Sequence, residues 1–321
     1  MARDFAMPRG PLGRSELQVS RLSLGSWRTF ERISRDRGLA VMRAAREHGF
    51  NFLDDARYND ETGSAPLPTG YSEVLFGELF RAAGWDRADT IVSNKLWWEF
   101  WPQESAAAEL EGSLTRMGFD YVDVIYANPP PDTLAVPEMV SAVAELVSSG
   151  KARTWGIVNW PAPQFGEAVR AAQEQGVPPP CAAQLPYSLA RRDWVEDPDT
   201  TAALEASGAG LVASYAMAGG VLTGKYDAGE TGRAAPELDD PRVADARALG
   251  RRVRKLADEV GVSPAALAIA FALSHPAAAT VLLGATTPAQ IAENVGALAV
   301  DPEIVERLRV EPLSVEHLRE L

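Results

Sequence analysis

Three polar residues in the first third of the chain have the types and the spacing needed to protonate a carbonyl oxygen. Asp54 and Lys95 each directly follow a short apolar run, and Tyr58 lies four residues after Asp54. A free tyrosine has a pKa of ~10 and is a poor acid at neutral pH, but a nearby ammonium stabilises the phenolate and lowers that pKa. A carboxylate beside the lysine would keep it charged and oriented, so the three side chains could act together as a general acid. The same spacing also fits a structural ion pair between Asp54 and Lys95, with Tyr58 on the surface.

The elements that must position these residues alternate between short β-type runs and amphipathic stretches of helical period. Strands are predicted at residues 22–24, 51–54, 90–95, 121–127, 154–158, 181–184, 210–214 and 280–283. Eight strands that are each followed by a helix predict an α/β fold, a parallel sheet closed into a (β/α)8 TIM barrel. Because no linker-like or low-complexity stretch divides the chain, residues 1–321 are predicted to form a single domain.

Two segments do not belong to this repeat. Residues 10–20 precede the first strand and are predicted to close the bottom of the barrel. The helical stretch at residues 241–274 is longer than one β/α unit needs, which predicts an extra helix after strand seven.

The C-terminal ends of the strands are where barrels of this kind carry their chemistry. Besides Asp54 and Lys95, that rule selects Trp27, Asn128, Asn159, Gln184 and the turn at residues 214–225. In this turn Gly219 and Gly220 permit a close approach of the backbone, and Lys225 supplies a positive charge.

A phosphate-binding segment is predicted after the last strand. Gly284 and Thr286 precede Thr287, a natural helix N-cap, and Gln290 stands at the third helical position, as in a capping box. Phosphate sites in barrels often form at such a helix start near strands seven and eight. A capped helix without any ligand fits the same residues.

Four large aromatic rings follow Lys95 in one loop, which is hard to explain as core packing. Trp97, Trp98 and Trp101, together with Phe100, are therefore predicted to form the wall of a substrate pocket. The alternative is a loop that folds over its own side chains.

The composition is that of an ordinary globular protein, with 46% hydrophobic and 23% charged residues. The 31 Lys and Arg against 44 Asp and Glu give a formal net charge of −13, which disfavours binding to nucleic acid or to anionic membranes. The single cysteine, Cys181, excludes an internal disulfide and a multi-cysteine metal site, and none of the three histidines follows a predicted strand. No metal site is predicted, and we expect a soluble cytoplasmic protein.

A series of ordered motifs over about residues 11–300 resembles the aldo-keto reductases, and within that family the branch of the potassium-channel β subunits. The motifs are LQVSRLSLGSW (17–27), GFNFLDDA (49–56), SNK (93–95), DYVDVIYAN (120–128), GKARTWGIVNW (150–160), GVLTGKY (220–226) and LGATTPAQIAENVGAL (283–298). The resemblance implies an NADPH-dependent carbonyl reductase on a (β/α)8 barrel, with a catalytic tetrad of Asp, Tyr, Lys and His. Asp54, Tyr58 and Lys95 match the first three members.

Three positions depart from the family pattern. Asn128 stands where most members have histidine, and it would orient the carbonyl by a hydrogen bond. The channel β subunits share this asparagine, bind NADPH tightly and turn over slowly, which implies an alternative function as a nucleotide-binding sensor or regulatory subunit with slow residual reductase activity. The family usually spaces Asp and Tyr by five residues, so either a bulge restores Tyr58 or Tyr71 replaces it. The aromatic residue that stacks under the nicotinamide matches Ser214, with Tyr215 beside it.

The resemblance also implies a site for NADPH or NADP+, with NADH left open. Asn159 and Gln184 match the residues that hold the nicotinamide carboxamide, and Lys225 and Arg233 could hold the 2′-phosphate. The implied cofactor site is Trp27, Asp54, Asn159, Gln184, Tyr215, Gly220, Lys225, Arg233, Gly284, Thr286, Gln290, Glu293 and Asn294. The implied partner is a small-molecule carbonyl substrate. The sequence leaves open whether the protein forms a homo-oligomer. It also leaves open a different function, that of a non-redox barrel enzyme that binds a phosphorylated metabolite.

Overall fold

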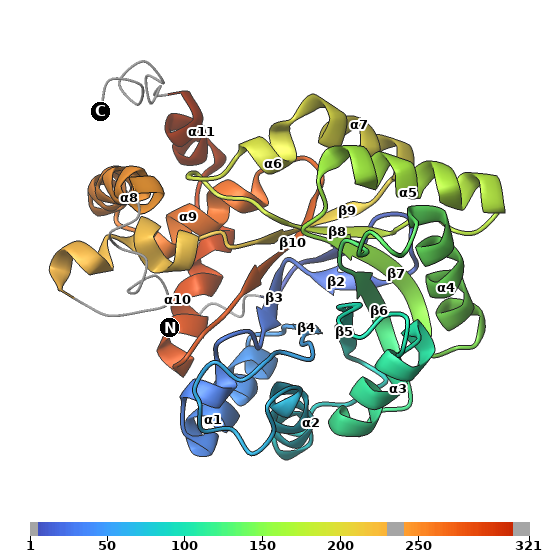
Figure 1. Ribbon diagram of the computed structural model, residues 1–321. Helices are drawn as coiled ribbons and strands as arrows, with labels where there is room; N and C mark the ends of the chain where they lie inside the picture. Colours follow the sequence, from blue (N-terminus) through green and yellow to red (C-terminus); the bar gives the residue numbers. More distant parts are fainter. Residues whose placement is uncertain (1–5, 230–240, 311–321) are drawn as a thin grey trace.

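Eight parallel strands close into a barrel at the centre of the protein (Figure 1). The computed structural model describes residues 6–229 and 241–310. Each barrel strand pairs with the next along the chain, and the last pairs with the first, so the order confirms the predicted (β/α)8 barrel. The observed bounds lie within two residues of the predicted ones: β3 (Leu22–Gly25), β4 (Phe52–Asp54), β5 (Ile91–Leu96), β6 (Val122–Ala127), β7 (Ala152–Val158), β8 (Ala182–Pro186), β9 (Gly210–Ser214) and β10 (Ala278–Leu283).

Helices that follow the strands form a ring around the barrel (Figure 1). Their ends carry the expected caps: the Ser34 and Ser105 hydroxyls accept backbone N–H groups at two helix starts, and Gly118 and Gly176 end two helices in the left-handed conformation. The helices are α1 (Arg35–Glu47), α2 (Tyr71–Ala82), α3 (Ala106–Met117), α4 (Val136–Ser148), α5 (Ala162–Gln175), α6 (Asp193–Glu196), α7 (Pro198–Ser207), α9 (Pro264–Leu273), α10 (Pro288–Val295) and α11 (Pro302–Val310).

An antiparallel hairpin of β1 (Arg9–Pro11) and β2 (Gln18–Ser20) closes the N-terminal end of the barrel, as predicted for residues 10–20. Leu12 and Val19 are fully buried and belong to the same apolar cluster as Phe52 inside the barrel. The turn of the hairpin approaches the barrel so closely that a Cβ on Gly13 would lie 2.2 Å from the carbonyl oxygen of Cys181, which directly precedes β8. Only glycine fits there, and its φ of +57° is also left-handed.

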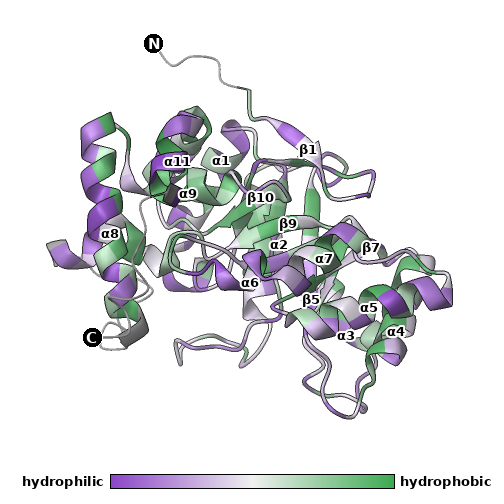
Figure 2. Cartoon of the chain, turned by 90° about the horizontal axis from the view of Figure 1, so that it is seen from above, coloured by the Kyte–Doolittle hydropathy of each residue, from purple (hydrophilic) through white to green (hydrophobic). Residues whose placement is uncertain are grey.

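The predicted extra helix is α8 (Pro241–Val260), which comes between β9 and α9 along the chain and lies outside the ring, next to α9 (Figure 1). It packs on the turn η2 (Ala218–Thr223) through buried Leu249 and Val253, and a Cβ on Gly250 would lie 2.4 Å from the carbonyl oxygen of Val221. Figure 2 shows α8 as largely hydrophilic, whereas β9 and β10 are hydrophobic. Among the described residues, no single helix combines the length and the apolarity needed to span a bilayer; α8 and α9 meet that test only as a pair, bent by 103°.

Candidate active site

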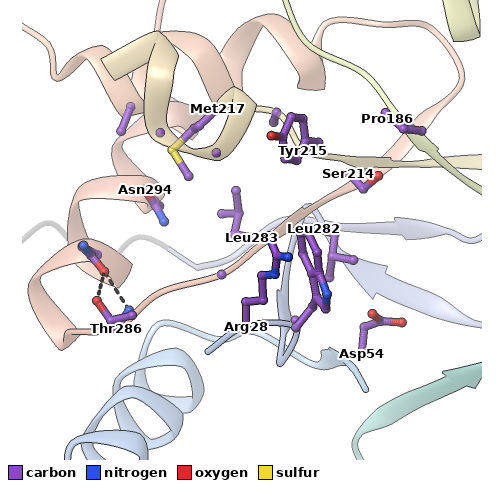
Figure 3. A pocket seen from close by; sticks show the side chains of 18 of the residues that line it. Arg28, Asp54, Pro186, Ser214, Tyr215, Met217, Leu282, Leu283, Thr286 and Asn294 are labelled. Atoms are coloured by element: carbon purple, nitrogen blue, oxygen red, sulfur yellow. Dashed lines mark hydrogen bonds between the residues drawn. The ribbon is translucent and has the colours of Figure 1, made fainter. Parts of the chain in front are cut away.

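A cavity of about 1230 Å³ lies at the C-terminal ends of the barrel strands. Figure 3 shows Asp54 on one side of it and Thr286 and Asn294 on the other. Most of the residues predicted from the sequence line this one cavity, although they come from nearly all parts of the chain. They are Trp27, Asp54, Tyr58, Lys95, Trp97, Asn128, Asn159, Gln184, Tyr215, Gly220, Lys225, Gly284, Thr286, Gln290, Glu293 and Asn294.

The ends of β4 and β5 bring Asp54 and Lys95 together. Nζ of Lys95 donates to Oδ2 of Asp54 at 2.5 Å, and the two side chains are only 5% and 3% exposed. The other carboxylate oxygen of Asp54 accepts a hydrogen bond of 2.7 Å from the Ser93 hydroxyl. A buried ion pair is stable only when its remaining polar atoms are also satisfied, and Ser93 meets that need for Asp54.

Tyr58 completes this group, although it lies only four residues after Asp54. Nζ of Lys95 donates to the phenol oxygen of Tyr58 at 3.1 Å. The backbone N–H of Tyr58 donates to the carbonyl of Ala56 at 2.8 Å, which is the hydrogen bond of a γ-turn centred on Arg57. With this tight turn, the Tyr58 hydroxyl reaches Lys95 despite the short spacing. The alternative residue, Tyr71, begins α2 and does not line the cavity.

A second buried carboxyl, Asp55, lies behind the ion pair and was not predicted from the sequence. Its side chain is fully buried, Oδ1 accepts from the Ser26 hydroxyl, and Oδ2 has no hydrogen-bond partner in the described part of the chain. Burial raises the pKa of Asp55 well above its usual value, and the nearby charge of Glu73 raises it further. Asp55 is therefore held in its neutral form over a wider pH range than an exposed aspartate.

Asn128 lies at the end of β6 and faces the cavity with 9% of its surface exposed. Its Nδ2 and its backbone N–H both donate to the carbonyl of Leu96, each at 3.0 Å. Because a side-chain amide has two N–H groups and one carbonyl oxygen, Asn128 retains polar capacity for a ligand.

The aromatic loop differs from the prediction. Trp97 lines the cavity, but Trp98 and Trp101 do not, so the predicted pocket wall is wrong for these two residues. Glu109 of α3 accepts hydrogen bonds from the backbone N–H groups of Trp97 (2.8 Å) and Trp98 (3.2 Å), and Trp98 adopts a left-handed φ of +61°. These contacts turn the Trp98 ring inward, where it is 4% exposed and packs edge-to-face on Trp101 at 6.1 Å. The loop folds over its own side chains at this point, which was the alternative.

Two amide side chains, Asn159 directly after β7 and Gln184 within β8, could hold a carboxamide. Asn159 has a φ of +57°, and its backbone N–H donates to the carbonyl of Gln184 at 3.0 Å. The Oε1 atom of Gln184 is buried and accepts no hydrogen bond from the described residues. A buried acceptor without a donor costs free energy, and an amide N–H of a ligand would satisfy it. The residues present therefore fit a nicotinamide carboxamide.

The turn after β9 lines the cavity with backbone atoms and with a positive charge. Gly219 and Gly220 have φ angles of +66° and +92°, and a Cβ on Gly220 would lie 2.7 Å from Cε of Lys225. Both Ser214 and Tyr215 line the cavity, and Tyr215 has a left-handed φ of +59°. The glycines thus let main chain and Lys225 lie side by side against the cavity.

The start of α10 forms the far end of the cavity. The Thr287 hydroxyl accepts from the N–H of Gln290 at 3.3 Å, as predicted for the N-cap. The side chain of Gln290 returns to the N–H of Thr286 at 2.7 Å, one residue before the atom that a standard capping box would use. This bond fixes Thr286, which lines the cavity together with Glu293 and Asn294.

The cavity is lined by more positive than negative groups, although the whole chain carries a net charge of −13. Among the described residues, two carboxylates line it, Asp54 and Glu293, against seven cations: Arg28, Arg32, Arg37, Lys95, Arg191, Lys225 and Arg254. Positive groups concentrated in a cleft attract an anionic ligand such as a dinucleotide phosphate.

Most of these cations were not predicted from the sequence as residues of the site. Arg28 directly follows Trp27, so the strand-end rule could have found it. Arg37 of α1 and Arg254 of α8 reach the cavity because of how their helices dock, which no local pattern shows. Arg233, predicted beside Lys225, lies outside the described residues.

Comparisons with known proteins support the resemblance seen in the motifs. The family model "Aldo/keto reductase family" matches residues 21–309. The chain is 35% identical over 317 residues to a probable voltage-gated potassium channel subunit beta of Oryza sativa subsp. japonica, covering 92% of this chain and 94% of the relative. It is 34% identical over 311 residues to a protein of the same description from Arabidopsis thaliana, covering 91% of each. A putative voltage-gated potassium channel subunit beta of Schizosaccharomyces pombe is 31% identical over 336 residues, covering 96% of this chain and 95% of the relative. The chain therefore belongs to the aldo/keto reductase family, a family of oxidoreductases.

Proposed function

We propose that this protein is a cytoplasmic NADP(H)-dependent oxidoreductase that reduces aldehyde or ketone carbonyls with Tyr58 as the general acid. One observation carries the proposal: Tyr58, Lys95 and Asp54 form a continuous chain of contacts of 3.1 and 2.5 Å at the wall of a large cavity. The orphaned acceptor on Gln184 and the cationic lining support a nicotinamide dinucleotide as the cofactor.

Four side chains have separate roles in protonating and orienting the carbonyl. A bound NADPH would supply the hydride to the carbonyl carbon. The Tyr58 hydroxyl donates its proton to the carbonyl oxygen, and the Lys95 ammonium stabilises the phenolate that is left. Asp54 holds this ammonium in place and balances its charge. The amide of Asn128 donates a hydrogen bond that orients the carbonyl.

The positive groups at the cavity favour NADPH over NADH. Lys225 lines the cavity beside the glycine turn, and by the resemblance Lys225 and Arg233 could hold the 2′-phosphate. Arg254, which donates to the carbonyl of Thr223 and also lines the cavity, adds a cation on the same side of the turn. A phosphate that carries extra negative charge gains more from these groups than a free hydroxyl does.

A second candidate function is a nucleotide-binding sensor or regulatory subunit with slow residual reductase activity. Asn128 favours it, because an amide cannot be protonated as an imidazole can, and so stabilises a developing oxyanion less. The relatives that are named as potassium channel β subunits agree with this candidate.

Turnover with a panel of aldehydes and ketones separates the two functions. The purified protein is assayed for NADPH oxidation with each compound, and its bound nucleotide is released and identified. Rapid turnover of one or more carbonyls supports the reductase. Nucleotide that copurifies without turnover supports the sensor, and failure to bind either NADPH or NADH would contradict both.

A further inference from the structure

Arg57 lies at the centre of the γ-turn that places Tyr58, and its side chain is almost completely buried. The guanidinium is 4% exposed and forms ion pairs with Glu104 at 2.9 Å and with Glu109 at 3.1 Å. Burial alone would lower the pKa of Arg57, but the hydrogen bond that the guanidinium donates to Glu104 and the charges of Glu109 and Glu104 together raise it. Arg57 is thus a permanent cation enclosed between two loops.

Glu109 extends this contact to the next loop of the barrel. Its carboxylate is 3% exposed, pairs with Arg57, and accepts the backbone N–H groups of Trp97 and Trp98. The ring of Trp97 in turn packs edge-to-face on the ring of Tyr58, with centroids 6.0 Å apart. Tyr58 is therefore held from two sides, by the peptide that joins it to Arg57 and by the Trp97 ring.

The negative charge of Glu109 depends in part on Arg57. Burial raises the pKa of Glu109, while the Trp97 N–H and the Arg57 charge act against that rise. Loss of the guanidinium would remove one of the groups that keep Glu109 ionised, and a protonated Glu109 is a weaker acceptor for the Trp97 and Trp98 N–H groups. A change at Arg57 therefore affects both the loop that carries Tyr58 and the loop that carries Trp97.

We propose that Arg57 is a positioning residue, whose ion pairs with Glu104 and Glu109 fix the Tyr58 hydroxyl against Lys95. The inference rests on the proposed reductase function, and it explains how a tyrosine four residues after Asp54 can serve as the acid. Arg57 touches neither Lys95 nor the cavity, so it acts through Tyr58 and Trp97.

A matched control pair lies at the opposite end of the barrel. Arg87 pairs with Asp123 at 2.7 Å, Asp123 is 2% exposed, and this carboxylate accepts the backbone N–H of Val92 in β5. As with Arg57 and Glu109, an arginine pairs with a buried carboxylate that accepts a backbone N–H, although Arg87 is 20% exposed and Asp123 also pairs with Arg153 at 2.8 Å. Arg87→Met removes a comparable ion pair without touching the cavity.

The test compares Arg57→Met, Arg57→Lys and Arg87→Met with the parent. We expect Arg57→Met to leave the Kd for NADPH within about twofold while kcat on a reactive aldehyde falls by roughly 10²-fold, the scale of a 1 Å misplacement of a catalytic group. Arg57→Lys should restore part of the loss, because the ammonium can pair with one glutamate. Arg87→Met should lower the Tm and leave kcat unchanged. Equal losses of kcat in Arg57→Met and Arg87→Met would show a general effect of stability and overturn the proposal.

A readout that needs no turnover separates this inference from the proposed function. The protein is labelled with 3-fluorotyrosine and studied by 19F NMR. The resonance of Tyr58 is assigned by its absence from the spectrum of Tyr58→Phe. We expect Arg57→Met, and Arg57→Lys to a smaller degree, to shift this resonance and move its titration to higher pH, since the phenolate would lie farther from Lys95. An unchanged Tyr58 resonance and titration in both Arg57 variants overturns the positioning role, whether or not the parent reduces carbonyls.

Discussion

The indole Nε1 of Trp98 donates a hydrogen bond of 3.0 Å to the backbone carbonyl of Asn128. Trp98 thus lies behind the site and anchors Asn128, the residue that the motif resemblance matches to the histidine of most family members. The side-chain amide of Asn128 is fixed as well, because Nδ2 donates to the carbonyl of Leu96. Asn128 is held rigidly from both sides, and its replacement tests what the amide contributes.

Asn128→His should raise kcat on a reactive aldehyde such as a nitrobenzaldehyde. The imidazole Nδ1–H can donate to Leu96 as the amide does, and a protonated Nε2 can give the carbonyl a charge-assisted hydrogen bond, about twice as strong as a neutral one. A gain of ~1.4 kcal/mol in the transition state would give a tenfold faster rate. Steady-state assays across pH ~5 to 8 should also show a pH dependence that the parent lacks. A variant that binds NADPH normally but is slower at every pH would show that the asparagine is the better-fitted residue.

The preference for NADPH over NADH should depend on Lys225 and Arg254. A charge-assisted contact contributes ~1.5–3 kcal/mol, so each replacement by methionine should raise the Kd for NADPH by roughly ten- to a hundredfold. The Kd for NADH should change far less. Fluorescence titration of both nucleotides measures these values, with Lys255→Met as the control, because Lys255 is exposed on α8 and does not line the cavity. Equal Kd values of the parent for NADPH and NADH would contradict the assignment.

Much of the fold and of the site follows from the sequence because both depend on local patterns. Apolar runs define the strands, and the strand-end rule then places Asp54, Lys95 and Asn128 at one rim. The choice between Tyr58 and Tyr71 could not be made from spacing, because it depends on a γ-turn hydrogen bond. The orientation of Trp98 could not be predicted either, since it is fixed by Glu109, which lies eleven residues farther along the chain.

The buried carboxyl of Asp55 predicts a specific dependence of stability on pH. Its pKa is raised in the folded protein by burial and then by the charge of Glu73, so its contribution to stability is complete below the unfolded pKa of ~3.9 and is lost as the pH rises towards the folded pKa. Asp55→Asn mimics the neutral acid, so the variant should lose no stability as the pH rises between these two pKa values. Its free energy of unfolding should therefore exceed that of the parent increasingly as the pH rises, by ~1.4 kcal/mol per pH unit within the window. Urea unfolding from pH 4 upwards measures the difference, and parallel curves would contradict a raised pKa.

The hairpin that closes the barrel should stabilise the fold without serving the site. Leu12 is fully buried in the apolar cluster of the barrel interior, so Leu12→Ala should lower the free energy of unfolding by ~2–5 kcal/mol, as for other large-to-small changes in a core. The Kd for NADPH should stay unchanged, because Leu12 lies at the end of the barrel away from the cavity. Leu67→Ala is the control, since Leu67 is 40% exposed. A stable Leu12→Ala protein would show that the hairpin is dispensable.

The most direct test of the account is the pair of variants Tyr58→Phe and Tyr71→Phe, assayed for kcat and for the Kd of NADPH. Tyr58 contacts Lys95 at 3.1 Å, whereas Tyr71 does not line the cavity. Loss of a general acid should cut kcat by at least ~10²-fold, so Tyr58→Phe should show this loss with nucleotide affinity nearly intact, and Tyr71→Phe should resemble the parent. A full loss of kcat in Tyr71→Phe together with near-parental turnover in Tyr58→Phe would contradict the account.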